Sequence, residues 1–164
     1  MYALQVEVLF NGTAAPMRRR ILTPLKQHLM SMPVDTGSSP QPRKLLDIAC
    51  GPGNSLEWIN RAMPEVSLYG VDLSPAYVRK ANENLADIKG TLPAQLVQAN
   101  AEALPFVDEF FEATTSTFLF HELPADARQN VINEAFRVTT PGGIFVICDS
   151  VQKMDTPEFE PLME

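Results

Sequence analysis

Cysteine, long apolar runs and basic charge are all scarce in this sequence of 164 residues. The two cysteines, Cys50 and Cys148, form no C-x-x-C pair and have no clustered histidines beside them. Their spacing therefore predicts no metal site, and it indicates buried free thiols of a reducing compartment. No apolar run approaches the roughly eighteen residues of a membrane span, and the N-terminus lacks a basic-then-apolar signal pattern. We therefore expect a cytoplasmic protein without a membrane span.

The charge balance is acidic. Asp and Glu number 20 against 13 Lys and Arg, which gives a formal net charge of −7. Nucleic acids and anionic membranes are bound by basic surfaces, so the balance argues against both and leaves a small-molecule substrate open. A basic run is formed by Arg18, Arg19 and Arg20, and we interpret it as a solvated helix face rather than a phosphate site.

The first part of the chain, residues 1–43, is expected to form an extended segment, a helical region and a linker. Apolar residues alternate over 2–10, which predicts a strand. From Thr13 the period becomes helical through Leu29, with an internal break at Thr23 and Pro24. Residues 33–42 are rich in Pro and Ser, which is typical of a linker.

From Lys44 the chain alternates between apolar strands and amphipathic helices. This alternation predicts a Rossmann-like α/β fold, doubly wound, with a mostly parallel sheet and helices on both faces. A turn at Pro141-Gly142-Gly143 should precede the last strand. The last helix should bury Val131, Ile132, Ala135 and Phe136. The expected strands cover 45–49, 66–72, 94–99, 111–118 and 144–148, and the expected helices cover 56–63, 75–85 and 124–139.

A glycine-rich loop follows the first of these strands. Gly51 and Gly53 lack a β-carbon, so the backbone can turn sharply there and approach a ligand at a helix N-terminus. The dinucleotide fingerprint needs a third glycine where Leu56 stands, and no Lys-Ser/Thr pair completes a phosphate loop. Asp47 lies four residues before Gly51, and a carboxylate beside the loop suits a cationic ligand better than a pyrophosphate.

The pattern of Asp47, Cys50, Gly51 and Gly53 resembles the first motif of class I S-adenosylmethionine-dependent methyltransferases. Asp72 closes the second strand about twenty residues beyond the loop, where a carboxylate can accept from both ribose hydroxyls. The other interpretation of Asp72 is a carboxylate that helps Ser74 cap the next helix. Because ligands of open parallel sheets bind at the carboxyl ends of strands, these residues are expected to share one site.

Two further runs extend the resemblance, particularly to methyltransferases related to menaquinone and ubiquinone biosynthesis. Asn100 stands where the family commonly has an acidic residue that contacts the adenine amine, and its amide oxygen can still accept. Its alternative role is to hold a turn. His121 and Glu122 follow the fourth strand as candidate catalytic bases, although a lone His is more often structural. The resemblance implies that the cofactor is bound by Asp47, Ala49, Gly51, Gly53, Asp72, Leu73, Asn100, Ala101, Glu102, Thr117 and Phe118.

The resemblance implies a methyltransferase domain over 44–164 that acts on a small molecule by in-line methyl transfer. This family has two further strands after the fifth, so the domain is expected to be truncated, with 144–148 at an exposed sheet edge. We expect either residues 2–10 or a second subunit to cover that edge, the latter as a homo-oligomer. Two alternatives stay open: a non-catalytic module or fragment that binds S-adenosylmethionine or S-adenosylhomocysteine, and, disfavoured by Leu56, an NAD-dependent oxidoreductase.

Overall fold

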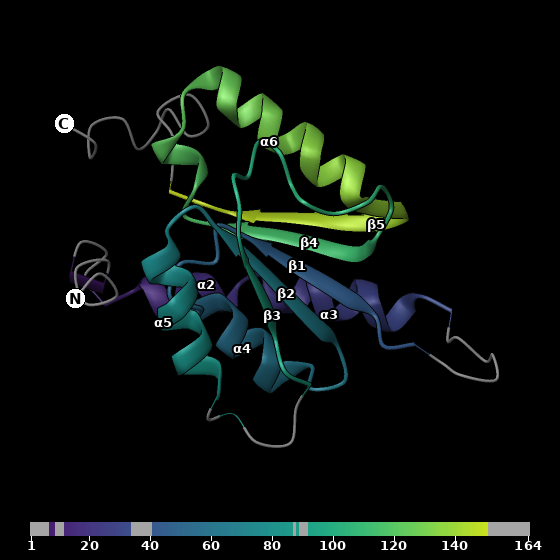
Figure 1. Ribbon diagram of the computed structural model, residues 1–164. Coiled ribbons are helices and arrows are strands. Elements are labelled where there is room, and N and C mark those ends of the chain that lie inside the picture. The colour runs from purple at the N-terminus through teal and green to yellow at the C-terminus, as the bar shows by residue number, and fades with distance from the viewer. Residues whose placement is uncertain (1–6, 9–11, 34–40, 87, 89–91, 151–164) are drawn as a thin grey trace, which may run out of the picture.

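The computed structural model describes residues 7–8, 12–33, 41–86, 88 and 92–150 (Figure 1). Its framework is a five-stranded sheet in the order β3-β2-β1-β4-β5, and all neighbouring strands are parallel. The predicted Rossmann-like parallel sheet is thereby confirmed. The strands are β1 (Lys44–Ile48), β2 (Ser67–Asp72), β3 (Gln95–Gln98), β4 (Phe111–Thr117) and β5 (Thr139–Cys148).

Helices cover both faces of the sheet, as predicted (Figure 1). On one face, α3 (Leu22–Ser31), α4 (Asn54–Ala62) and α5 (Pro75–Ala86) pack around Leu45, Leu56 and Leu68. On the other, α6 (Ala125–Val138) packs against Leu46 and Ile48. Alternate β1 side chains enter opposite core clusters, because successive residues of a strand point to opposite faces.

Local sequence signals account for the ends of these helices. Pro75 opens α5 at the first helical position, where its missing N–H removes no helical hydrogen bond. The hydroxyl of Ser74 accepts from the Tyr77 N–H at 3.4 Å, which is the expected cap. None of the helices in the described part of the chain is long and apolar enough to cross a bilayer.

The N-terminal helical region packs directly on the sheet. It consists of α2 (Ala14–Arg19) and α3, which are separated at Arg20 and Ile21 rather than at the predicted Thr23-Pro24. Pro24 instead lies in the first turn of α3, where proline is tolerated. Ile21, Leu25 and Leu29 are buried in the same core cluster as Leu45.

The strand order reverses between β1 and β4. From β1 the chain builds outward through β2 and β3, and then returns to place β4 and β5 on the other side of β1. Asp47, near the carboxyl end of β1, is opposite Gly70 on β2 and Thr115 on β4. Open parallel sheets bind ligands at such a reversal, outside the carboxyl ends of the strands.

Besides the helix break, three local predictions are wrong. Glu7 and Val8, the only described residues of the predicted strand 2–10, are helical. Phe136 is 70% exposed, because the buried stripe of α6 runs along Ala127, Val131, Ala135 and Val138. Residues 141–143 lie inside β5, where the ladder with β4 shifts register and Gly142 has φ of +78°. Most of the segment expected to cover the edge strand lies outside the described residues.

Candidate functional site

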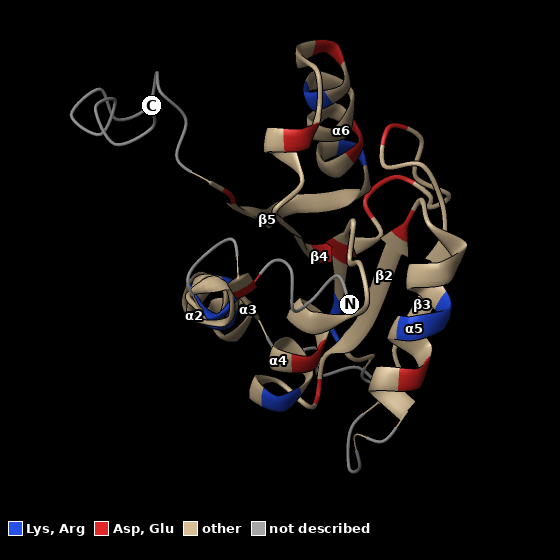
Figure 2. Cartoon of the chain, turned by 90° about the vertical axis from the view of Figure 1, so that its left-hand side faces the viewer, with Lys and Arg blue, Asp and Glu red and all other residues tan. Residues whose placement is uncertain are grey.

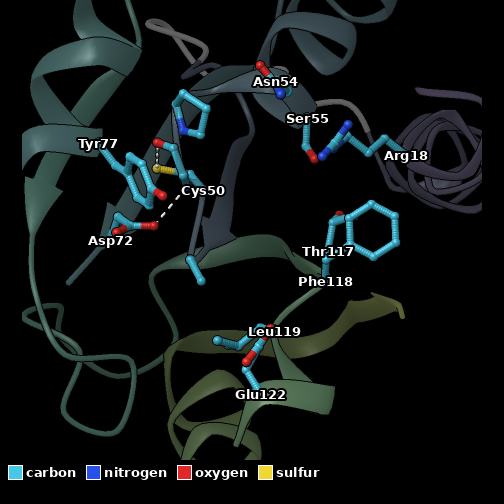
Figure 3. A pocket seen from close by; sticks show the side chains of 13 residues that line it. Arg18, Cys50, Asn54, Ser55, Asp72, Tyr77, Thr117, Phe118, Leu119 and Glu122 are labelled. Carbon is cyan, nitrogen blue, oxygen red and sulfur yellow. Dashed lines mark hydrogen bonds between the residues drawn. The ribbon is translucent and has the colours of Figure 1, made fainter. Parts of the chain in front are cut away.

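A pocket opens at the carboxyl ends of β1, β2 and β4. Its cavity measures about 190 Å³. Arg18 extends into it from α2, Asp72 and Tyr77 lie on the opposite side, and Leu119 and Glu122 lie below (Figure 3). Six of the predicted site residues line this pocket: Ala49, Gly51, Asp72, Thr117, Phe118 and Glu122.

The glycine loop forms the wall between β1 and α4. Gly51 and Gly53 have φ of +54° and +87°, a region that favours glycine. A β-carbon at Gly53 would lie 3.2 Å from Cβ of Ala81, so the loop packs closely on α5. Asn84 of α5 donates to the Pro52 carbonyl at 2.9 Å and ties the loop down. The first N–H groups of α4 are therefore presented at a fixed position, as an anionic ligand group requires.

Asp47 lies near the carboxyl end of β1, just before this loop, and is not among the residues that line the pocket. Its side chain is 1% exposed, and neither carboxylate oxygen has a hydrogen-bond partner among the residues described. Burial, reinforced by the negative charge of Asp72 and partly offset by Arg18, raises the pKa of Asp47 to about 8. A buried carboxylate without a donor is costly, and it would be relieved by a cationic ligand group.

Arg18 is a pocket residue whose side chain was wrongly predicted to lie in solvent. It is only 7% exposed, so the interpretation of its basic run as a solvated face fails here. Its guanidinium lies 5.1 Å from the centre of the Phe118 ring and forms an ion pair with Glu7 at 3.5 Å. Other Lys and Arg residues lie on α5 and α6, away from α2 (Figure 2). Arg18 thus brings a buried positive charge to the pocket, close enough to act on Asp47.

Asp72 is held by two backbone groups. One oxygen accepts from the Gly51 N–H at 2.8 Å and the other from the Ser74 N–H at 2.9 Å. The carboxylate therefore joins the glycine loop to the start of α5. Its hydrogen bond to the Ser74 N–H also fits the alternative interpretation, in which Asp72 helps to cap that helix. Each carboxylate oxygen has a second lone pair, so acceptance from a ligand hydroxyl remains open.

Unusual backbone geometry marks the two strand ends at the reversal. Ala49, just after β1, has φ of +59°, and Phe118, just after β4, has φ of +60°. Non-glycine residues rarely adopt this region, and such strain is concentrated at functional sites. Beside Phe118, the buried hydroxyl of Thr117 has no hydrogen-bond partner within the described ranges, and the residue lines the pocket.

The residues predicted to bind adenine lie outside the pocket lining. Asn100 is exposed, and its side-chain oxygen accepts from the Glu102 N–H at 3.0 Å, which is the turn-holding role. Glu102 in turn accepts from Asn130 of α6 at 2.9 Å. Leu73 is 68% exposed beside Asp72, and Ala101 is partly buried. Leu73 thus leaves an apolar surface next to the Asp72 carboxylate.

The candidate bases lie in the 3₁₀ turn Phe120–Glu122 after β4. Glu122 lines the pocket, whereas His121 lies between two carboxylates. Its Nδ1 is 2.5 Å from Oδ1 of Asp149, and its Nε2 is 3.2 Å from Oε1 of Glu122. Asp149 follows the last residue of β5 and was not predicted as part of the site.

Cys50, part of the first motif, also lines the pocket. Five further lining residues were not predicted from the sequence: Pro52, Asn54, Ser55, Tyr77 and Leu119. Most of them flank the glycine loop, so proximity to Gly51 and Gly53 is a signal that could have found them. Cys50 and Cys148 are free thiols, as predicted. Burial, with the nearby charges of Asp47 and Asp72, raises the pKa of the Cys50 thiol, which keeps it protonated and weakly nucleophilic.

Comparison with known proteins agrees with this arrangement. The family described as "Methyltransferase domain" matches residues 45–143. A demethylmenaquinone methyltransferase of Thermus thermophilus is 32% identical over 116 residues, which are 71% of this chain and 51% of the relative. The chain spans about half the length of the curated relatives it matches.

Two solved structures share the fold. A putative S-adenosyl-L-methionine-dependent methyltransferase of Methanococcus maripaludis superposes with a TM-score of 0.69 at 17% identity, covering 97% of this chain and 71% of that one. A SAM-dependent methyltransferase of Methanosarcina mazei gives a TM-score of 0.57 at 27% identity, covering 66% and 53%. The first of these shows the fold alone. The family match over residues 45–143, together with the Thermus and Methanosarcina relatives, confirms the resemblance drawn from the motifs: the chain belongs to the class I S-adenosylmethionine-dependent methyltransferase family.

Proposed function

We propose that this chain binds S-adenosylmethionine in the pocket at the β1–β4 reversal and transfers its methyl group to a small-molecule acceptor. The observation that carries the proposal is Asp47, a buried carboxylate whose oxygens find no donor within the described residues. Arg18 lines the pocket and carries a buried positive charge that acts on Asp47. Opposite charges at this spot fit the zwitterionic amino-acid end of the ligand, with its ammonium toward Asp47 and its carboxylate toward Arg18.

A dinucleotide or nucleoside triphosphate fits this arrangement poorly. Its phosphates would lie close to Asp47 and Asp72, and like charges at short range in a poorly solvated site repel strongly. The glycine loop still offers N–H groups at the start of α4, and one carboxylate of the amino-acid end can use them alongside Arg18. The charge pattern therefore favours a sulfonium amino acid over a pyrophosphate.

The ribose and the adenine of the ligand would lie along the carboxyl ends of the strands, away from Asp47. Asp72 would accept from the ribose hydroxyls through its remaining lone pairs, while its hydrogen bonds to Gly51 and Ser74 hold it in place. Leu73 gives the adenine an apolar surface, and Asn100 with Ala101 lies one strand further along. The ribose role of Asp72 and the adenine role of Asn100 and Ala101 were expected from the sequence, whereas the adenine contact of Leu73 is proposed from its exposed position beside Asp72.

When bound, the donor supplies a methyl group on a positively charged sulfur. The chain's own contribution is to align the two reactants and to exclude water, as in-line displacement requires. The acceptor would approach from the side of Leu119 and Glu122, which lie below the pocket in Figure 3. A small-molecule acceptor is supported by the Thermus relative, which is named for demethylmenaquinone.

Calorimetry with S-adenosylhomocysteine tests donor binding, with NAD and ATP as phosphate-bearing controls. Ligand at a hundred times its Kd adds about 2.7 kcal/mol of stability, a shift of several degrees in the unfolding temperature of a domain this size. Asp72→Ala should weaken binding, whereas Asp108→Ala removes a carboxylate with 74% of its side chain exposed and should not. Equal or tighter binding of NAD or ATP would overturn the proposal.

Methyl transfer separates catalysis from the alternative of a non-catalytic binding module. Tritiated methyl groups should move from S-adenosylmethionine to an extractable acceptor, with reduced menaquinone precursors and fatty acids as the first probes. Binding of S-adenosylhomocysteine without transfer to any acceptor would favour the binding module.

A further inference from the structure

Asp149 holds the imidazole of His121 from the end of a neighbouring strand. It follows Cys148, the last residue of β5, while His121 lies in the turn after β4. The two strands are adjacent in the sheet, so their ends bring residues 28 positions apart to a separation of 2.5 Å between Oδ1 and Nδ1. The Asp149 side chain is only 13% exposed.

The Asp149 carboxylate is itself fixed by backbone donors. Oδ2 accepts from the Phe120 N–H at 2.6 Å, and Oδ1 accepts from the Ser150 N–H at 2.7 Å. A carboxylate anchored on both oxygens holds one orientation, and an ionised carboxylate only accepts hydrogen bonds. The Nδ1 of His121 must therefore be the donor in this contact.

Glu122, on the other side of the ring, is placed differently. It contacts Nε2 at 3.2 Å, but its side chain is 74% exposed, so it can swing into solvent at little cost. Glu122 also lines the pocket, so Nε2 lies on the side of the ring next to a pocket residue, although His121 itself is not part of the lining. One nitrogen is thus held by a rigid acceptor, while the other contacts a solvent-exposed side chain that itself lines the pocket.

We propose that Asp149 is a positioning residue that keeps the proton of neutral His121 on Nδ1 and leaves Nε2 as the base for the methyl acceptor. The base role rests on the proposed function. As the acceptor is methylated, its X–H bond breaks, the proton moves to Nε2, and the X–H electron pair stays on the acceptor. The resulting imidazolium is stabilised by the negative charge of Asp149, and its proton then passes to solvent. Glu122 is assigned no proton in this step.

Nitrogen NMR tests the positioning without any ligand. The chain has two histidines, so protein labelled with ¹⁵N in its imidazoles gives two ring systems, and His121→Gln assigns them. At neutral or mildly alkaline pH we expect the neutral His121 ring to carry its proton on Nδ1. In Asp149→Ala the Nδ1–H form should lose its dominance. Asp149→Asn, whose amide oxygen can still accept, should restore it.

The reactivity of Nε2 separates a base from a merely structural histidine. Diethyl pyrocarbonate acylates an unprotonated, accessible imidazole nitrogen, and mass spectrometry locates the product. We expect wild-type His121 to react at Nε2, several-fold faster than in Asp149→Ala. Glu122→Gln is the matched control and should leave the Nδ1–H form in place. The signals of His28, on α3, report in every variant whether the fold is intact.

Two results would overturn the proposal. The first is an Nε2–H ring in the wild-type protein, or the same tautomer after Asp149→Ala in a variant with unchanged His28 signals. The second is an Nε2 that does not react at all, which would make the contact purely structural. Failure of the proposed function is distinguishable, since it would appear as lost S-adenosylhomocysteine binding with the Nδ1–H ring retained.

Discussion

Replacing Asp47 by Asn should stabilise the ligand-free protein at alkaline pH while weakening donor binding. The pKa of Asp47 is about 8 in the folded chain, against an ordinary value of 3.8. Between these values the folded state holds a proton that the unfolded state has lost, so the stability contributed by this group falls as pH rises from about 4 to about 8. Asn has no such proton, and its amide is neutral throughout.

The size of the change in unfolding free energy depends on how much of the pH interval between the two pKa values the experiment covers. Each pKa unit corresponds to about 1.4 kcal/mol, so from pH 6 to pH 9 the wild-type protein should lose about 2 to 3 kcal/mol relative to Asp47→Asn. For a domain of this size that is roughly 5 to 10 °C in the unfolding temperature. Solvent screens this charge little, because Asp47 is only 1% exposed.

Thermal unfolding of both proteins across this pH range is the assay, and Asp126→Asn, which removes an exposed carboxylate, is the control for charge alone. A stability difference that stays constant from pH 6 to pH 9 would refute the raised pKa. Calorimetry adds a second check: an ammonium ligand favours the ionised carboxylate, so S-adenosylhomocysteine uptake near pH 7 should release a proton from wild type that Asp47→Asn lacks.

Three further predictions follow from the geometry. Arg18→Met keeps the side-chain stem but removes the charge, so S-adenosylhomocysteine affinity measured by calorimetry should fall about tenfold to a hundredfold; an unchanged Kd would remove Arg18 from the site. Gly53→Ala places a β-carbon 3.2 Å from Ala81 at a φ of +87°, and urea unfolding should show a loss of about 1 kcal/mol or more. Phe136→Ser should change stability by less than about 0.5 kcal/mol, whereas Val131→Ala at a fully buried site should cost about 2 kcal/mol; equal losses would contradict the observed face of α6.

The sheet could be predicted because its strands are apolar runs separated by turn signals. The same reasoning failed for α6, where Phe136 has helical spacing from Ile132. The helical spacing of apolar residues identifies which side chains share one face of the helix. How much of that face is buried depends on how the helix lies on the sheet. Here the contact is centred on Val131 and Ala135, and Phe136 lies beyond it.

The candidate site was predictable where one strand end carries its own motif. Asp47, Gly51 and Asp72 lie at the ends of β1 and β2, and the structure brings the last two together through a hydrogen bond of 2.8 Å. Arg18 and Asp149 carry no such motif. Their place depends on the rotation of α2 against the sheet and on the neighbouring position of β4 and β5, both of which are set by long-range packing.

The order in which the chain emerges during synthesis gives the strand reversal a kinetic meaning. Residues 44–98 supply β1, β2 and β3, but one edge of β1 remains unpaired until β4 arrives, more than 60 residues after β1. The lining of the pocket includes Thr117, the last residue of that late strand, and Phe118, which follows it. A ligand can therefore contribute little to the early stages of folding. Its stabilisation should appear as slower unfolding of the finished protein, since interactions absent from the folding transition state act on the unfolding rate.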